Sequence, residues 1–218
     1  MANKLSLLSR AKIILKREGF IAFLRRALTF PLRRIPGYDY KTFYVYEHNI
    51  RERNEADFLP RIKDFTFHVV TSNQQAEEMA RMGLDIYPDN KFARIRLHRG
   101  AIAFCVFVGT KLVHIGWLAL NERAKNSFDP YPYPVDFPRV ACTGGTRTIP
   151  EFEGKGLMTY VYYKRFDYLR QKGILRSRNA VETSNSASQK VHEKFAPKKS
   201  RGYYLKVGRW RFWREAKL

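Results

Sequence analysis

The feature that most constrains the fold is the stretch Thr146–Leu157 (TRTIPEFEGKGL), where a β-strand pattern runs through a glycine loop directly into a helix. The strand pattern ends at Pro150, which cannot continue a sheet ladder. Gly154 and Gly156 lie in the loop, and the apolar spacing of residues 157–171 predicts a helix. Free N–H groups and the positive end of the helix dipole would then converge at one point, which suits a phosphate group.

The rest of the chain predicts an α/β domain on a mixed sheet. Strands are expected at residues 38–46, 65–70, 92–97, 101–108, 111–120, 139–149, 174–182 and 203–213, and helices at 73–82, 157–171 and 185–195. Gly109-Thr110 separates two strand patterns and predicts a hairpin. Residues 126–138 contain four prolines and predict a long loop, which we expect to form a lid or a wall of a binding site.

Two motifs in this region resemble the signatures of one family. Glu151–Gly156 (EFEGKG) matches both glycines of a strand followed by Q/R-x-x-G-x-G/A, with Glu151 at the first position. Asn185–Phe195 (NSASQKVHEKF) is similar to N-x-x-S-x-x-x-[YH]-E-K-x-G-F, although Ala196-Pro197 stands where Gly-Phe is usual. In these motifs and their order the chain resembles the GNAT superfamily of acyl-CoA-dependent N-acyltransferases. The resemblance is specific over residues 139–205 and only architectural over 60–138.

The resemblance implies a GNAT-like mixed, mainly antiparallel central sheet with flanking helices. It also implies an enzyme that moves an acetyl or longer acyl group from acyl-CoA to a primary amine, by direct attack in a ternary complex and without a metal. The donor would lie between two splayed parallel strands, at 146–149 and 180–182. The alternative function is a non-catalytic module of the same fold that binds acyl-CoA or an anionic membrane.

The residues implied to bind the donor follow from these motifs. A backbone N–H near Thr148 or Ile149 would hold the acyl carbonyl. Asn185 and Ser188 would lie along the pantetheine arm or cap the second helix. The pyrophosphate would be bound by Phe152, Glu153, Gly154, Lys155, Gly156 and Leu157.

Two residues are candidates for proton transfer. His192 occupies the position where the family often has a tyrosine that protonates the leaving thiolate, and a structural role is the alternative. Glu182, at a strand end, is the candidate base for the amine, unless it is a structural carboxylate and water accepts the proton. The remaining histidines show no ligand spacing, and Cys105 and Cys142 lie in apolar stretches, so neither a metal site nor a disulfide is expected.

Charge is distributed unevenly along the chain. The 218 residues include 41 Lys plus Arg and 20 Asp plus Glu, a net charge of +21. Residues 1–38 and 189–218 carry +16 of it, and apolar residues in 7–15 and 20–28 recur at helical spacing. We therefore expect a basic amphipathic helical appendage at 1–37 and the acyltransferase domain at 38–218.

Three interpretations of the appendage remain open. It binds an anionic membrane, it packs on its own domain or on the partner in a homodimer, or it contacts nucleic acid. The amphipathic pattern makes nucleic acid the least favoured of the three. A cytoplasmic location is expected, with the inner face of the membrane as the site of peripheral attachment, because no apolar run approaches the ~20 residues that span a bilayer.

The basic C-terminal block carries two further expectations. It could attract an acidic acyl carrier protein as an alternative donor. Its aromatic residues alternate with Lys and Arg, which predicts a last strand with the aromatic side chains inward and the basic ones outward, rather than a platform for single-stranded nucleic acid.

Overall fold

The computed structural model describes residues 37–87 and 92–218. The predicted helical appendage therefore lies outside the described residues, apart from its last residue. The chain divides into two compact units, one of Met1–Lys41 with Tyr204–Phe212 and one of Thr42–Tyr203 with Trp213–Leu218. The second unit contains every residue that the two motifs single out.

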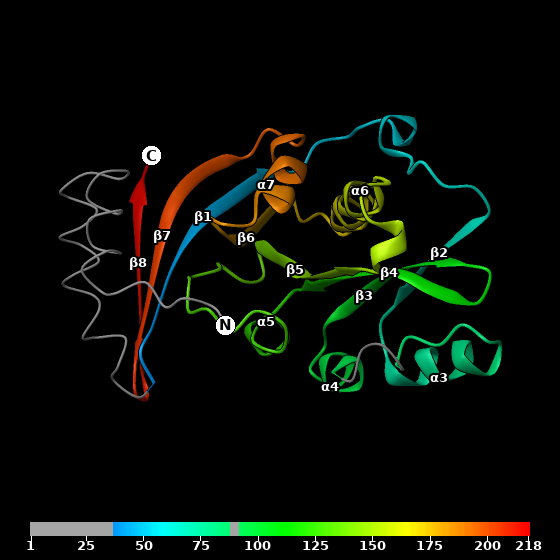
Figure 1. Ribbon diagram of the computed structural model, residues 1–218, viewed down its shortest axis with the longest axis horizontal. Helices are drawn as coiled ribbons and strands as arrows, with labels where there is room; N and C mark the ends of the chain where they lie inside the picture. Colours follow the sequence, from blue (N-terminus) through cyan, green and yellow to red (C-terminus); the bar gives the residue numbers. More distant parts are fainter. Residues whose placement is uncertain (1–36, 88–91) are drawn as a thin grey trace, which may run out of the picture. The chain divides into compact units, whose positions relative to one another are not determined.

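The strands form one eight-stranded sheet in the order β2-β3-β4-β5-β6-β1-β7-β8 (Figure 1). Their bounds are β1 Asp39–Asn49, β2 Phe65–Val70, β3 Ile102–Val108, β4 Lys111–Ala119, β5 Val140–Thr148, β6 Arg176–Glu182, β7 Lys198–Val207 and β8 Trp210–Lys217. Neighbours from β2 to β5 are antiparallel, β5 and β6 are parallel, and β6 and β1 are again antiparallel. The expected mixed, mainly antiparallel sheet is confirmed.

Helices cover both faces of this sheet. The side chains of β3 point alternately to the two faces, and both faces are buried. Phe104 and Val106 pack on one face with the helix α6, Leu157–Gln171, whereas Cys105 and Phe107 pack on the other face. A strand buried on both sides must be apolar at every position, as β3 is. Figure 1 shows α6 and α7 (Ser186–Glu193) on one side of the sheet and α3 (Asn73–Arg81), α4 (Ala93–His98) and α5 (Glu122–Lys125) on the other.

Most predicted elements form where the sequence places them, but the strand expected at 92–97 is wrong. That segment is the helix α4, which buries Ala93 and Leu97 four residues apart and leaves Ile95 48% exposed. In so short a segment, charged and apolar residues that alternate also satisfy the i, i+4 spacing of one helical face. Packing against the rest of the core selects the helix.

The C-terminal strand pattern is two strands, β7 and β8, with a turn between them at Gly208. The expectation that the aromatic side chains point inward is wrong for Trp210 and Phe212, which are 61% and 54% exposed. Trp213, one position on, points the other way and packs against Phe43. The alternation is real, but its register puts two aromatic rings on the solvent side.

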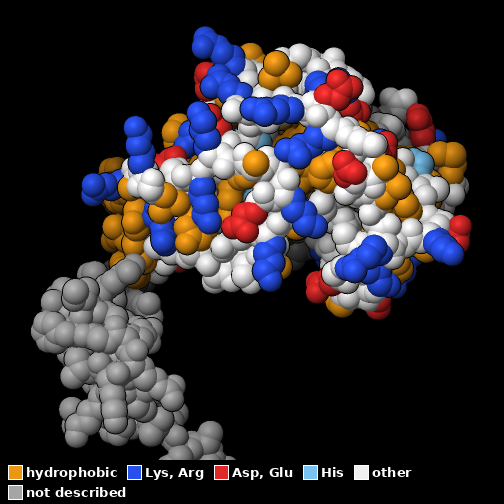
Figure 2. Space-filling view, turned by 90° about the horizontal axis from the view of Figure 1, so that it is seen from above, with side chains coloured by type: hydrophobic (Ala, Val, Ile, Leu, Met, Phe, Trp, Pro, Cys, Tyr) orange, Lys and Arg blue, Asp and Glu red, His pale blue; other side chains and the backbone are white. Residues whose placement is uncertain are grey.

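Lys and Arg side chains are spread over the face shown in Figure 2, with fewer acidic ones between them. Among the described residues, no helix has the length and the hydropathy needed to cross a membrane.

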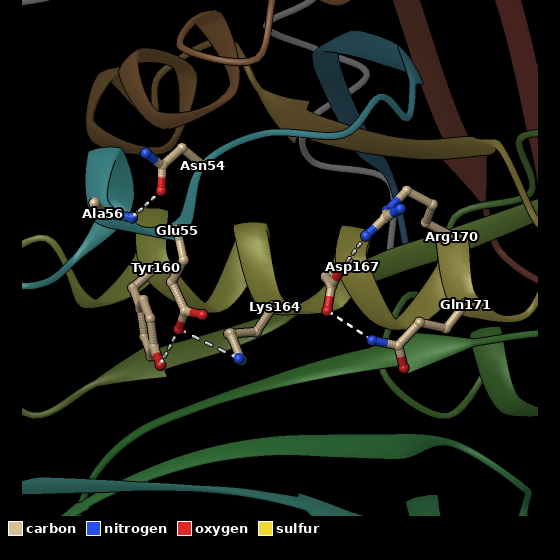
Figure 3. A network of polar contacts seen from close by, with 8 residues as sticks. All are labelled: Asn54, Glu55, Ala56, Tyr160, Lys164, Asp167, Arg170 and Gln171. Carbon is tan, nitrogen blue, oxygen red and sulfur yellow. Dashed lines mark hydrogen bonds and ion pairs between the residues drawn. The ribbon is translucent and has the colours of Figure 1, made fainter.

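A polar network fixes α6 from its outer side (Figure 3). The Glu55 carboxylate accepts hydrogen bonds from the Tyr160 hydroxyl at 3.0 Å and from the Lys164 ammonium at 3.3 Å. Asn54 caps the short 3₁₀ turn Glu55–Phe58 through the amide of Ala56. These contacts tie the segment before β2 to the first half of α6, the part of the helix that follows the glycine loop.

Candidate active site

A cleft opens where the parallel strands β5 and β6 separate. Their pairing runs only from Val140↔Arg176 to Cys142↔Arg178, yet β5 continues to Thr148 and β6 to Glu182. Beyond Cys142 the two strands no longer share hydrogen bonds, so a cleft of about 870 Å³ lies between them. Its lining comes from β5, the glycine loop, the start of α6, the end of β6 and the first turns of α7.

The glycine loop forms one end of the cleft. Gly154 and Gly156 have φ of +71° and +88°, a left-handed conformation that glycine adopts without strain. The first intrahelical hydrogen bond of α6 runs from the Tyr160 amide to the Gly156 carbonyl. The amides before Tyr160 therefore have no partner inside the helix and point toward its N-terminal end.

The loop is braced by Arg61 and carries charges of both signs, with Glu151 and Glu153 beside Lys155. Arg61 donates to the Gly154 carbonyl at 2.6 Å through its guanidinium, and its own amide donates to the Lys155 carbonyl at 2.8 Å. The Lys155 ammonium lies 4.6 Å from the Phe152 ring centroid. Positive charge and unpaired amides at one helix end are the elements of an anion site.

The structure brings most of the predicted site residues together. Those that line the cleft are Thr148, Phe152, Glu153, Gly154, Gly156, Leu157, Glu182, Asn185, Ser188 and His192. Ile149 and Lys155 do not line it. The Ile149 amide donates to the Val113 carbonyl at 3.1 Å, so it is not available to hold an acyl carbonyl.

Asn185 is the N-cap of α7. Its Oδ1 accepts a hydrogen bond from the Ser188 amide at 3.0 Å. Ser188 is 8% exposed and lies beside Asn185 on the cleft wall. The two polar residues of the second motif thus form the capped start of α7, which faces the cleft.

His192 is fully buried at the cleft wall, in a chain of polar side chains. The Asn179 amide donates to its Nε2 at 3.1 Å, so Nδ1 carries the hydrogen and donates to His48 Nε2 at 3.0 Å. The ring also stacks on Tyr46 at 4.7 Å. Burial above all, and then the nearby His48 and Arg165, hold the pKa of His192 well below its ordinary value. At neutral pH the ring is uncharged with both nitrogens engaged, which does not favour the expected donation of a proton to a thiolate.

Glu182 lines the cleft at the end of β6, next to Tyr131 of the proline-rich loop. It pairs with Phe43 across β6 and β1, and its carboxylate accepts a 3.4 Å hydrogen bond from the Tyr131 hydroxyl. Tyr131 and Phe43 are also in ring contact, with centroids 4.5 Å apart. The loop at 126–138 therefore supplies a cleft wall through Tyr131, as its composition predicted.

Buried polar groups hold this loop in place. The Asp129 carboxylate accepts from the Tyr133 hydroxyl at 2.6 Å and from the Tyr131 amide at 3.2 Å. The Lys125 ammonium donates to the Tyr131 carbonyl at 2.5 Å. Burial raises the pKa of Asp129 above its ordinary value, while Lys125 and the hydrogen bonds oppose that shift. The wall is thereby fixed to the core rather than left as an open flap.

Several cleft residues were not predicted from the sequence. Asn179, Phe43 and Tyr131 lie on a strand interior or in the proline-rich loop, outside both motifs. One signal was present, because Ser177, Asn179 and Val181 share the inward face of β6 and two of them are polar. A buried polar side chain on a strand needs a partner, and here the partner is His192. Over the described residues, no group of acidic, His and Cys side chains is arranged to hold a metal ion.

The sheet order, the separated parallel pair and the glycine loop at a helix start define a fold of the acyltransferase type, with a cleft between two splayed strands. The family model described as the GNAT acetyltransferase family matches residues 72–196. This range is more than half of the chain, so the chain belongs to the GNAT acetyltransferase family.

Solved structures are similar to the chain at low sequence identity. One is a region of a fungal multi-domain β-N-acetylglucosaminidase, described as a GCN5-related glucosamine N-acetyltransferase, with 12% identity, a TM-score of 0.50, and coverage of 84% of this chain and 22% of that one. A Drosophila protein shows 12% identity, a TM-score of 0.47, and coverage of 85% and 57%. A putative GNAT acetyltransferase from Novosphingobium aromaticivorans shows 11% identity, a TM-score of 0.45, and coverage of 78% and 66%.

The chain thus spans 57% of the Drosophila protein and 66% of the Novosphingobium protein. None of the curated protein sequences compared with the chain matches it.

Proposed function

We propose that the protein transfers an acetyl or longer acyl group from acyl-CoA to a primary amine, by direct attack within a ternary complex. The observation that carries this proposal is the cleft between β5 and β6 that ends at the unpaired amides of the glycine loop. The cleft offers an anion site at the glycine loop and a carboxylate at Glu182, and a thioester donor that carries a pyrophosphate, together with an amine acceptor, would use both.

The donor pyrophosphate would bind at the loop from Phe152 to Leu157, where the left-handed Gly154 and Gly156 let a phosphate approach the backbone. The amides from Gly154 onward would donate to it, because those of Phe152 and Glu153 already donate to the Ile149 and Pro150 carbonyls. Lys155 would add positive charge near this point. The pantetheine arm would run along β5 past Thr148 toward the wall formed by Asn185 and Ser188, which line the same cleft.

In the reaction, the amine nitrogen attacks the thioester carbonyl carbon, and the C=O bond becomes a C–O⁻ bond. Collapse of this tetrahedral species re-forms the carbonyl and breaks the C–S bond, so the leaving group is the CoA thiolate. The attacking amine loses a proton to Glu182, directly or through water, and the thiolate gains a proton from solvent. His192 would act through Asn179, by fixing that amide in the cleft wall.

A Gly156 variant tests the proposed donor site. Acetyl-CoA or a longer acyl-CoA should raise the melting temperature of the wild-type protein, and Gly156→Val should abolish this rise, because a β-branched side chain is strained at a φ of +88° and fills the approach to the loop. Gly173→Val is the matched control. Gly173 has a φ of +73° at the other end of α6 and is not part of the cleft lining.

Gly173→Val should lower the melting temperature of the free protein yet keep the rise with ligand. If no acyl-CoA from acetyl to palmitoyl raises the wild-type melting temperature, and no acylated carrier protein does so either, the proposal is wrong. An acyl-CoA that binds but yields no acylated amine and no free thiol with any primary amine would support the non-catalytic binding module instead.

We also propose that residues 1–36 attach the protein to an anionic membrane surface. The support is the sequence pattern, in which basic residues flank two apolar stripes of helical spacing. The acyl-transfer proposal includes an acidic acyl carrier protein as an alternative donor, attracted by the basic C-terminal block.

A further inference from the structure

Arg165 is a buried cation on the helix that leads away from the glycine loop. It is 0% exposed, and its three guanidinium nitrogens donate to the Val161 carbonyl at 3.3 Å, the Trp117 carbonyl at 3.1 Å and the Thr146 hydroxyl oxygen at 3.3 Å. None of the ion pairs between described residues includes it. A buried charge without an opposite charge is costly, so its retention calls for a reason.

The sheet makes room for this guanidinium at Gly116. A Cβ atom there would lie 2.8 Å from Arg165 Nη2, closer than packing allows. The register of β4 and β5 shifts at the same point, between Ile115 and Trp117, and Gly145 of β5 has a φ of +56°. Such a bulge redirects a neighbouring side chain, here that of Thr146.

The chemistry of the Arg165–Thr146 contact assigns the donor and the acceptor. A guanidinium has only donors, so the Thr146 oxygen must be the acceptor. The hydroxyl hydrogen of Thr146 therefore points away from Arg165, and among the described residues no acceptor is bonded to it. Thr146 lines the cleft on β5, beyond the point where β5 and β6 separate.

We propose that Thr146 donates a hydrogen bond to the thioester carbonyl oxygen of the bound acyl donor, and that Arg165 is the positioning residue that orients this hydroxyl and places a positive charge behind it. This inference rests on the proposed acyl transfer. As the amine attacks, the carbonyl oxygen becomes negative, and a donor oriented before the reaction stabilises that charge without reorganisation. A cation behind the donor strengthens it further, because the surrounding dielectric is low.

Thr148 provides the internal comparison. It lies two residues further along the same strand, lines the same cleft, and its hydroxyl oxygen is 2.7 Å from His114 Nδ1. Burial lowers the pKa of His114 to about 3, so its partner is a neutral ring at pH 7. Thr148 thus shares the residue type, strand and cleft of Thr146, but its hydroxyl contacts a neutral ring and not the guanidinium of Arg165.

The test compares the affinity of acetyl-CoA with that of free CoA, measured by calorimetry on the full chain, since only acetyl-CoA carries the carbonyl. Thr146→Val should weaken acetyl-CoA binding by roughly five- to tenfold and leave CoA binding unchanged. Thr146→Ser should restore the wild-type ratio of the two affinities. Thr148→Val keeps the backbone N–H of that residue and removes a hydroxyl that contacts His114, so any change in affinity should be equal for the two ligands and the ratio should stay the same.

Arg165→Met tests the positioning role. It should change the ratio as Thr146→Val does, and the double variant should be no worse than Thr146→Val alone, because both remove the same hydrogen bond. Should Arg165→Met fail to fold, the two Thr146 variants still decide the matter. An unchanged ratio in Thr146→Val overturns this inference, whereas failure of the wild-type protein to bind either ligand overturns the proposed function as well.

Discussion

Three buried histidines show how single residues of this chain respond to their surroundings. His48 and His192 touch each other on one face of the sheet, and His114 bonds Thr148 on β5. Burial is the main cause that lowers the pKa of all three, to about 3 for His48 and His114. A histidine that stays neutral in the folded state but is protonated in the unfolded state makes stability depend on pH.

We expect the free energy of unfolding to fall as the pH drops from 7 to 5. Over this interval the unfolded chain takes up a proton at each such histidine, near the ordinary pKa of 6.5, while the folded chain does not, so each contributes a loss of about 2 kcal/mol. His114→Gln should therefore lose about 2 kcal/mol less than the wild type between the two pH values, as measured by urea unfolding. Replacement of the exposed His98 by Gln serves as the control, and equal losses in His114→Gln and the wild type would contradict the prediction.

For single residues, the sequence identified those that belong to a motif. It missed those whose role depends on a contact with a residue far away in the chain. Asn185, Ser188 and the loop glycines were singled out from their spacing, and they meet at one cleft. Arg165 and Gly116 were not singled out, because an arginine on a helix is usually solvated and nothing local indicates that a strand glycine 49 residues earlier receives it. Only packing brings these two together.

At the scale of elements, variants at the start of α7 test two properties separately, the stability that the helix cap provides and the affinity for acetyl-CoA. Asn185→Ala removes the acceptor for the Ser188 amide and should lower the free energy of unfolding by about 1 kcal/mol, whereas Asn185→Ser should retain most of it. Urea unfolding measures the stability, and calorimetry with acetyl-CoA measures affinity in the same variants. Alanine and serine variants of equal stability would show that Asn185 does not act as the cap.

Long helices and strands with a regular apolar pattern were predicted correctly, whereas short helices were not. The apolar spacing over 157–171 predicted α6, and Gly109-Thr110 predicted the β3–β4 hairpin. The six-residue α4 was predicted as a strand because six residues satisfy both periodicities. The four-residue α5 was not predicted, because its start depends on the Asn121 cap rather than on an apolar stripe.

At the scale of the whole molecule, the charge of the terminal blocks suggests where the protein works. We expect the full chain to bind vesicles that contain anionic lipid, and replacement of Arg25, Arg26, Arg33 and Arg34 by Gln to weaken binding roughly a thousandfold, at about 1 kcal/mol for each basic residue. Cosedimentation at two salt concentrations measures this. The same number of substitutions on the domain surface (Arg81, Arg99, Arg123 and Lys172 to Gln) is the matched control.

Equal vesicle binding by the two charge variants would mean that the total charge matters and the appendage does not. Vesicle binding by neither the wild type nor the variants would remove the membrane proposal and leave the acyl-transfer proposal untouched.

The sequence by itself determined the fold class, the strand–loop–helix unit at the glycines, and the family resemblance, because these depend on local periodicity and on residues close together in the chain. The tertiary structure alone decided that His192 is neutral, that the Ile149 amide donates to the Val113 carbonyl, and that the Tyr131 hydroxyl donates to Glu182. It also placed the guanidinium of Arg165 behind Thr146. Each of these depends on burial or on contact between residues far apart in sequence, and long-range packing sets the pKa of a ring or the direction of a hydroxyl hydrogen in a way that residue spacing does not record.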